Sequence, residues 1–331
     1  VLNFLEYAFD SFLLRVMLIL ILLFWSTLVS FSTLGYYHFP KDYFTSPVKG
    51  PIRLSGTFGE LRPNHLHAGI DIKGSVGQSL YAAANGYISR IKVQKDGYGK
   101  VLYIRHPNGY TSVYAHMNSF EPEVEAYVKS IQYEKKQFEV EIYPAKGKFS
   151  YQKGQKIGTM GVTGRSFGPH LHFEIRNTRS EKPLNPLLFN FVVEDTRSPR
   201  LHNLRLYYLD NNAETIEKKT FSLIRRKNGD YRVSGDTLTV PASNIGLALK
   251  AYDHMNGVSN WNGVYSLKVL ENDNSYFEFK MDSFSFKETR YINAHLDYED
   301  MVTDKSYFNR CYLLPGNKLS VYSHDAEKGI I

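Results

Sequence analysis

Cysteine is nearly absent from this sequence of 331 residues, which contains only Cys311. A single cysteine excludes an internal disulfide framework and any zinc module built from cysteine thiolates. A metal site in this chain would therefore depend on histidine and carboxylate side chains.

Long runs of like charge and internal repeats are also absent. The formal net charge is +7 and the sequence pI is about 9.1, but no long Lys/Arg run concentrates this charge. A dispersed positive charge is a weak bias towards acidic surroundings such as cell-wall polymers, anionic lipid or nucleic acid. We expect no nucleic-acid partner. The hydrophobic and charged fractions are ordinary for a globular protein, and the length is sufficient for two domains.

One long apolar run stands near the N-terminus, in "RVMLILILLFWSTLVSFSTLG", where Val16–Phe31 carries no charge. Its length lies between that of a signal-peptide core and that of a full bilayer span. The small residues Ser30 and Ser32 favour cleavage by a signal peptidase. The acidic residue Glu6 is unfavourable in the N-terminal region of a signal peptide, which is usually positively charged. We expect residues 1–36 to be a signal peptide or an N-terminal membrane anchor, and the chain to be exported.

A regular alternation of helices and strands is missing. Residues 37–194 instead contain short alternating segments separated by glycine, such as "YAAANGYISRI" and "GKVLYIRHPNGYTSVYAHM". This pattern predicts a compact antiparallel β-sheet domain. Asn85-Gly86 and Asn108-Gly109 lie between strand-like runs, where they are typical of tight hairpin turns.

A charged insertion interrupts this domain at about residues 121–153. Pro122 is a favourable first residue of a helix, and "FEVEIY" from Phe138 to Tyr143 alternates like a strand. We expect this segment to lie beside the core sheet and to lengthen one wall of a cleft.

A second β-rich series follows the linker-like "EDTRSPR". We place a domain boundary near Asp195 and expect residues 195–331 to form a β-sandwich-like accessory module. The ending at "AEKGII" has neither a turn nor a polar tail, which is compatible with a longer protein. The predicted fold class is thus mainly β, with a compact antiparallel β-sheet domain followed by a smaller β-sandwich-like module.

Two histidines flank a leucine in "GPHLHFEIR". The alternation after the Gly-Pro pair predicts a strand, in which residues two apart point to the same face. His170 and His172 would then project side by side, while Leu171 packs on the opposite face. Two converging imidazoles form half of a transition-metal site.

Further candidate ligands stand at "NHLHAGIDIKG", where His67 and Asp71 are separated by three residues. Gly69 and the neighbouring isoleucines favour a turn into a strand over a helix. His67, Asp71 and one histidine of the later pair would provide three N/O ligands and leave a fourth position for water. A third segment, "TSVYAHMNSF", supplies Tyr114 and His116.

Together these segments resemble the lysostaphin or LytM-type zinc peptidases, whose motifs read H-x-x-x-D, then Y-x-H, then H-x-H in this order. The resemblance covers about Phe58 to Arg176 and implies the family's β fold, the duplicated hybrid motif. It also implies a zinc ion held by His67, Asp71 and His172, with His116 and His170 as catalytic histidines. All five of these positions carry the family's residue.

Other polar residues have less specific patterns. Arg62, Asn64 and Tyr114 are candidates for substrate binding because they adjoin the motifs, and His65 stands in the same segment. We interpret His106 as structural, because no other histidine is paired with it in the sequence. The remaining isolated histidines are expected to have surface roles: His202, His254, His295 and His324.

The sequence thus predicts an exported zinc metalloendopeptidase of the bacterial cell envelope. Its substrates would be peptide cross-links of peptidoglycan, hydrolysed by a zinc-activated water. The alternative is a non-catalytic envelope scaffold or activator of other cell-wall hydrolases, against which the intact ligand set argues. A lipoyl-type carrier module is a third interpretation, but this sequence lacks the modifiable lysine between hairpin strands that such a module needs.

Overall fold

The computed structural model describes residues 39–234, 238, 240, 244–324 and 328–331. The chain divides into two units, Val1–Pro40 and Lys41–Ile331. The predicted signal or anchor segment, residues 1–36, lies outside the described residues. Among the residues that are described, no helix has the length and apolar character needed to cross a membrane.

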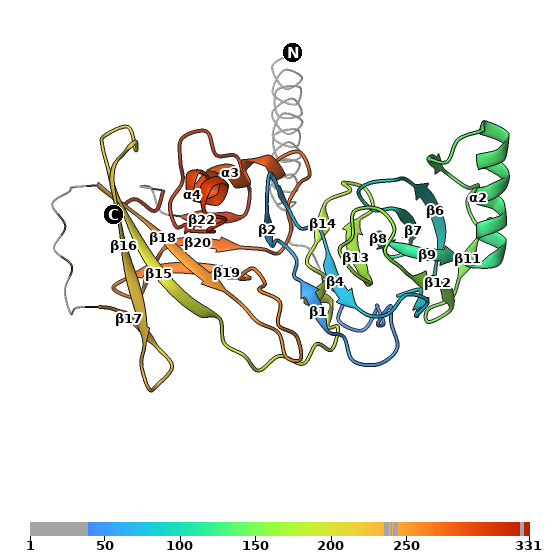
Figure 1. The fold of residues 1–331 in the computed structure, drawn as a ribbon, viewed down its shortest axis with the longest axis horizontal. Helices are drawn as coiled ribbons and strands as arrows, with labels where there is room; N and C mark the ends of the chain where they lie inside the picture. The colour runs from blue at the N-terminus through green and yellow to red at the C-terminus, as the bar shows by residue number, and fades with distance from the viewer. Residues whose placement is uncertain (1–38, 235–237, 239, 241–243, 325–327) are drawn as a thin grey trace, which may run out of the picture. The chain divides into compact units, whose positions relative to one another are not determined.

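The first half of Lys41–Ile331 is organised around an antiparallel sheet (Figure 1). Its central path runs in the order β1 (Leu54–Gly56), β4 (Ile70–Lys73), β13 (His170–Asn177), β8 (Tyr110–Ala115), β7 (Lys100–Arg105), β6 (Gly86–Val93) and β10 (Val140–Ile142). Two short strands extend it, β11 (Ser150–Tyr151) beside β6 and β14 (Pro183–Leu184) beside β13. This arrangement confirms the predicted antiparallel β class.

A smaller antiparallel sheet and a short hairpin complete this half. The sheet contains β5 (Ser79–Tyr81), β12 (Lys156–Met160) and β9 (Met117–Phe120), and the hairpin pairs β2 (Leu61–Arg62) with β3 (His65–Leu66). Every residue of β8 is buried, so this central strand is covered on both faces. On one face, Val113 and Ala115 pack with Val101 and Tyr103 of the neighbouring strand.

The two asparagine–glycine pairs have different structural roles. Gly109 has φ +84° and lies in the turn between the paired strands β7 and β8, which confirms the predicted hairpin. Gly86 begins β6, and the preceding strand β5 belongs to another sheet, so the prediction of a hairpin there was wrong. Glycine is required at position 86 for another reason, because a Cβ would lie 2.5 Å from the carbonyl oxygen of Arg105.

The charged insertion forms the predicted elements. Helix α2 (Pro122–Lys135) begins at the proline and β10 lies within the predicted strand. Glu123 and Glu125 occupy the first turn, where the helix dipole favours negative charge. Val124 and Val128 are the buried residues of this helix, which lies on the outside of the sheet (Figure 1).

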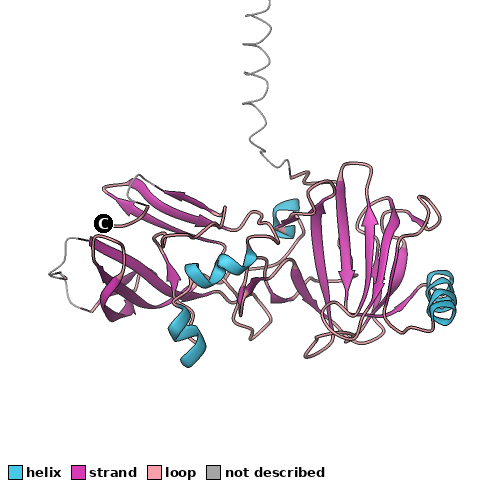
Figure 2. Cartoon of the chain, turned by 90° about the horizontal axis from the view of Figure 1, so that it is seen from above, coloured by secondary structure: helices cyan, strands magenta, loops and turns pink. Residues whose placement is uncertain are grey.

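The second half also contains two antiparallel sheets, visible as magenta strands in Figure 2. One has the order β17 (Tyr231–Val233), β16 (Thr215–Arg225), β15 (Arg200–Leu209), β18 (Asn244–Tyr252) and β21 (Asn309–Arg310). The other has the order β19 (Ser266–Glu271), β20 (Asn274–Lys280) and β22 (Tyr322–His324). Short helical segments lie between these strands in the sequence: η2 (Thr289–Tyr291), α3 (Ile292–His295) and α4 (Tyr298–Thr303).

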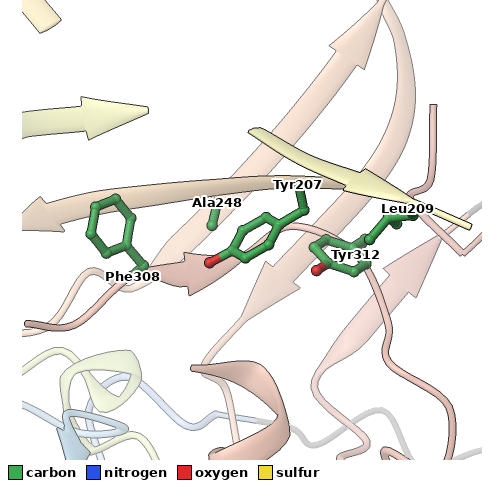
Figure 3. Packing of buried hydrophobic residues seen from close by; sticks show 5 residues of the cluster. All are labelled: Tyr207, Leu209, Ala248, Phe308 and Tyr312. Carbon is green, nitrogen blue, oxygen red and sulfur yellow. The ribbon is translucent and has the colours of Figure 1, made fainter. Parts of the chain in front are cut away.

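A cluster of buried side chains holds the larger of these sheets to the segment that follows α4 (Figure 3). Its members are Tyr207, Leu209, Ala248, Phe308 and Tyr312. Burial of each large side chain contributes about 1.5–3 kcal/mol to folding. The hydroxyl of Tyr207 donates a hydrogen bond to Asp297 at 2.6 Å, so its polar end is satisfied inside the cluster.

Buried contacts join the two halves. The rings of Phe58 and Phe284 pack with centroids 5.3 Å apart, and both residues are buried. The backbone N–H of Leu66 donates to the hydroxyl of Thr289 at 2.8 Å. Asn185 Nδ2 donates to the backbone carbonyl of Met281 at 3.1 Å. Both β-rich halves thus belong to the single unit Lys41–Ile331, and independent folding of residues 195–331 stays a prediction.

Candidate metal centre and active site

Strand pairing brings the separated histidine motifs together. In the ladder between β13 and β4, His172 lies opposite Asp71, and in the ladder between β13 and β8 it lies opposite Ala115. His116 follows Ala115 directly at the end of β8. Register therefore places residues from three distant segments in one row across the sheet.

Three side chains converge on one point: Asp71 from β4, His172 from β13, and His67 from the segment between β3 and β4. His67 Nε2 lies 3.0 Å from Asp71 Oδ1, and His172 Nδ1 lies 2.9 Å from the same oxygen. The two ring nitrogens are themselves 2.9 Å apart. These residues are 2%, 6% and 3% exposed, so the converging atoms lie in the protein interior. The structure brings together the three predicted ligands, His67, Asp71 and His172.

In His67 and His172, one ring nitrogen faces the cluster (the inner nitrogen) and the other faces away from it (the outer nitrogen). The hydrogen-bond partner of the outer nitrogen shows where the ring carries a proton. His67 Nδ1 lies 2.7 Å from the carbonyl oxygen of Thr57, which can only accept, so this nitrogen carries the proton. His172 Nε2 lies 2.8 Å from the carboxylate of Glu174 and donates to it. The lone pair of the inner nitrogen of His67 therefore faces the Asp71 carboxylate. Burial would lower the pKa of His172, but Asp71 and Glu174 raise it to about 9, so its inner nitrogen carries a proton that it shares with Asp71 unless a bound cation replaces that proton.

Three acceptor atoms within about 3 Å of one another repel unless a cation or a shared proton lies between them. Two neutral imidazole nitrogens and one carboxylate oxygen form a ligand set suited to zinc in a catalytic site. The ring nitrogen of each imidazole that faces away from the cluster donates its N–H to an oxygen, of Thr57 for His67 and of Glu174 for His172. Metal-ligating histidines usually make such a hydrogen bond. The donor chemistry thus fits a zinc ion.

Asp71 divides its two oxygens between different partners. Oδ1 faces the imidazoles, while Oδ2 accepts from Arg62 Nη2 at 2.8 Å. Burial would raise the pKa of Asp71, but the adjacent His67 and His172 hold it well below its usual value. Burial lowers the pKa of His67 to about 4. The cluster therefore contains a carboxylate and a neutral His67 at pH 7.

Glu174 anchors His172 and was not identified from the sequence. It is fully buried, and its second oxygen accepts from Arg176 Nε at 2.6 Å. Tyr98 donates a short hydrogen bond to the oxygen that also accepts from His172. Burial would raise the pKa of Glu174, but Arg176 and His172 lower it to about 2. Strand alternation was an available signal, because His170, His172 and Glu174 share one strand parity.

His116 and His170 lie beside this cluster. Their ring centroids are 4.7 Å apart, and His170 Nε2 is 3.6 Å from Asp71 Oδ1. His116 Nδ1 donates to the carbonyl of Thr163 at 2.8 Å, and His170 Nδ1 donates to that of Gly168 at 2.9 Å. Both Nε2 atoms therefore carry lone pairs when the rings are neutral. Burial lowers the pKa of His116 to about 4.

The three predicted substrate-binding residues have different positions. Arg62 is at the site, because it forms ion pairs with Asp71 and with Glu60, the latter at 3.1 Å. Asn64 is exposed on the β2–β3 hairpin, where its Oδ1 accepts from Asn293 at 2.8 Å. His65 is exposed on the same hairpin.

Tyr114 requires a correction. It is fully buried and its hydroxyl accepts from the backbone N–H of Ala83 at 2.7 Å, so no substrate outside the core can reach it. The same hydroxyl lies 2.9 Å from Ser112 Oγ, which is also 2.8 Å from His106 Nε2. His106 itself is buried and hydrogen-bonded on both nitrogens, in agreement with the structural role predicted for it.

The expectation of surface roles was wrong for two other histidines. His295 is 1% exposed and its ring stacks on Phe279 with centroids 4.4 Å apart. His254 is 7% exposed and packs against Trp261. His202 is partly buried and His324 is exposed. Isolation in the sequence did not indicate exposure, because burial here depends on residues that are distant along the chain.

Comparison with known proteins agrees with this geometry. Residues 65–133 and 146–186 match the model of peptidase family M23. The chain therefore contains a domain of the M23 family, to which the LytM and lysostaphin-type peptidases belong. The segment left out of the match, residues 134–145, lies within the charged insertion.

Two curated relatives show partial similarity. The DD-carboxypeptidase/endopeptidase Mpg of Neisseria meningitidis serogroup B is 34% identical over 140 residues, which cover 41% of this chain and 26% of the relative. The murein hydrolase activator NlpD of Escherichia coli is 36% identical over 150 residues, covering 45% of this chain and 32% of the relative. This chain thus spans about a quarter to a third of the length of these relatives.

Solved structures give a similar partial match. The catalytic domain of lysostaphin from Staphylococcus simulans is 21% identical, with a TM-score of 0.32. The match covers 42% of this chain and 92% of that chain.

Proposed function

We propose that this protein is an exported zinc metalloendopeptidase that cleaves peptide cross-links of peptidoglycan in the bacterial cell envelope. The observation that supports this most strongly is the convergence of three potential ligand atoms, from His67, Asp71 and His172, beside two further imidazoles. The M23 domain and the similarity to the DD-carboxypeptidase/endopeptidase Mpg support a peptidase. The similarity to NlpD, a murein hydrolase activator, supports a role at peptidoglycan.

In this proposal His67 Nε2, Asp71 Oδ1 and His172 Nδ1 hold the zinc ion. The ion supplies Lewis acidity, which activates water and polarises the peptide carbonyl. Glu174 and the carbonyl of Thr57 keep the imidazoles in the tautomers that ligation needs. Arg62 holds the second oxygen of Asp71, which leaves Oδ1 directed at the cluster.

His116 and His170 are the proposed catalytic histidines. Each ring is oriented by a hydrogen bond from Nδ1 to a backbone carbonyl, which leaves Nε2 free for proton transfer. A neutral imidazole accepts a proton from the attacking water, and an imidazolium stabilises the developing oxyanion. Burial lowers the pKa of His116 to about 4, so this ring is neutral at pH 7 and its Nε2 can accept a hydrogen bond from the attacking water.

A second candidate function is non-catalytic activation of other cell-wall hydrolases. The similarity to NlpD, whose name describes a murein hydrolase activator, favours it. The complete set of five site residues favours catalysis, because an activator needs neither the group of three potential ligands nor the two histidines beside it.

Purified full-length protein incubated with isolated peptidoglycan tests both functions. An endopeptidase releases peptides whose masses identify the cleaved bond, and a zinc chelator stops the release. An activator releases nothing alone and increases the products of an added hydrolase. The Asp71→Ala variant is the matched control, because it should abolish autonomous cleavage and spare activation.

A further inference from the structure

A cavity of about 510 Å³ lies between the two β-rich halves of Lys41–Ile331 and outside the metal centre. Its wall from the first half is Gly59–Leu61, and its opposite wall includes Trp261–Val264, Lys250 and Lys305. The volume falls within the range of small-molecule sites. None of the proposed metal ligands or catalytic histidines lines it.

Trp261 forms an aromatic platform in this cavity. Three neighbouring rings pack against it, with centroids 5.0 Å away at Tyr252, 5.5 Å at His202 and 4.6 Å at His254. Even so, 52% of the residue is exposed. A large ring that is fixed and yet solvated is suited to stack on the apolar face of a ligand ring, because little conformational entropy is lost on binding.

Asn262 follows Trp261 and lines the same cavity. It is 1% exposed, and neither its side-chain oxygen nor its side-chain nitrogen has a hydrogen-bond partner in the described part of the chain. Two backbone hydrogen bonds with Asp253, both 2.9 Å, hold the residue in place. A buried amide without partners is costly, and a ligand that has both a donor and an acceptor would relieve this cost. An acylamino group has both.

Two lysines give the cavity a positive side. Lys250 and Lys305 both line it, and Lys250 Nζ donates to Ser306 Oγ at 3.0 Å, which leaves further N–H donors on the ammonium group. The acidic residue of the wall, Glu60, is already paired with Arg62. The free positive charge favours a ligand with a carboxylate.

We propose that this cavity binds an N-acylated amino sugar that carries a free carboxylate, as found in glycan strands of peptidoglycan from which the stem peptides have been removed. The ring stacks on Trp261, the acylamino group pairs with Asn262, and the carboxylate lies towards Lys250 and Lys305. The choice of peptidoglycan as the source rests on the proposed function. Glu60 connects the cavity to the metal centre through Arg62 and Asp71, so a glycan held here lies against the wall that supports a metal ligand.

Tryptophan fluorescence of this 331-residue chain can report on the cavity. The chain contains two tryptophans, Trp25 and Trp261, so the Trp25→Phe variant reports on the cavity alone. Titration with N-acetylmuramic acid should change its fluorescence saturably. N-acetylglucosamine, which lacks the carboxylate, and muramic acid, which lacks the acetyl group, should each bind about tenfold more weakly. Absence of a saturable change at the solubility limit of N-acetylmuramic acid would overturn the inference.

Substitutions separate binding from folding. Asn262→Leu should weaken binding of N-acetylmuramic acid by about tenfold and leave the melting temperature unchanged or higher, because it removes an amide that has no partners. Asn274→Leu, at an exposed position of β20, is the matched control and should bind normally. A lower melting temperature of Asn262→Leu with unchanged affinity would assign Asn262 a structural role and contradict the proposal.

The proposed role of Lys250 and Lys305 is tested by the selectivity of the cavity for an acidic over a neutral sugar. Lys250→Gln combined with Lys305→Gln should abolish the preference for N-acetylmuramic acid over N-acetylglucosamine and keep the affinity for the neutral sugar. An acetylated dipeptide with a free carboxylate provides the competing ligand class. Equal or tighter binding of this dipeptide would overturn the assignment of a sugar.

Failure of this inference differs from failure of the proposed function. Chelator-sensitive cleavage of peptidoglycan without sugar binding would refute the cavity assignment and leave the peptidase intact. Sugar binding that is weakened about tenfold in Asn262→Leu, in a protein that cleaves nothing, would support the cavity assignment and refute the peptidase.

Discussion

Glu174 accepts a 2.8 Å hydrogen bond from Nε2 of His172, which stands two residues earlier on strand β13. The same carboxylate is fixed by Arg176 and Tyr98. This bond determines which nitrogen of His172 faces Asp71 and His67. The orientation of a proposed metal ligand thus depends on a carboxylate that never touches the metal position.

Glu174→Gln should therefore weaken zinc binding without abolishing it. The amide oxygen can still accept from His172, but it loses the charge that raises the basicity of the imidazole. Loss of such an outer partner typically costs 10- to 100-fold in metal affinity, about the decrease we expect here. Competition with a chromophoric chelator measures the affinity, and an unchanged value would show that Glu174 acts only in packing.

One zinc ion per chain should depend on His67, Asp71 and His172. Removal of one of three protein ligands leaves too few bonds to hold the ion, so Asp71→Ala and His172→Ala should lose it. The exposed His65, in the same sequence segment, is the matched control, and His65→Ala should keep full occupancy. Full zinc content in Asp71→Ala would show that the ligands are different ones.

His116→Ala and His170→Ala should retain zinc and lose turnover. Neither ring belongs to the converging ligand group, whereas both lie beside it with Nε2 free. General acid–base groups contribute about 10²- to 10⁴-fold, and kcat should fall by about this factor with KM little changed. Zinc content, melting temperature and turnover are measured on the same samples. Zinc loss in His170→Ala would make His170 a ligand and His172 the catalytic member.

Acid should destabilise the fold through buried histidines outside the metal centre. Burial lowers the pKa of His295 to about 4, while an exposed histidine titrates near 6.5. Below pH 6.5 the unfolded chain binds the proton and the folded chain does not, so stability falls until about pH 4. The loss is roughly 1.4 kcal/mol per pH unit. His295→Gln keeps an N–H donor for Asn309, and its urea unfolding should depend less on pH between 6.5 and 4.

Removal of the second half should affect stability more than chemistry. We expect a chain ending near Val193 to keep zinc and to hydrolyse a soluble peptide, because every residue of the proposed site precedes this point. Its melting temperature should fall, since Phe58 and the backbone N–H of Leu66 lose partners in the second half. A folded, zinc-loaded truncation without activity would contradict a division of roles near Asp195.

Local pattern was sufficient for the strands and for the candidate ligands. Alternation in "HLHFEIR" predicts a strand with His170 and His172 on one face, and a side-chain period of two is a property of any strand. The helix start at Pro122 likewise follows from its fixed φ and missing N–H. The resemblance of the ordered motifs to the LytM-type peptidases then selected five histidine and aspartate residues, which the structure brings into one cluster.

Tertiary structure decided what the local patterns left open. Tyr114 adjoins a motif, but its side chain is completely buried, packed against Phe173 and hydrogen-bonded to the backbone of Ala83. His172 meets Asp71 across 101 residues because of strand register, and the cavity beside Trp261 exists because Gly59–Leu61 faces a segment some 200 residues away. A sequence pattern with a period of two specifies which side chains share a face of a strand. Whether that face meets solvent, a metal or another sheet depends on long-range packing, for which this local pattern carries no signal.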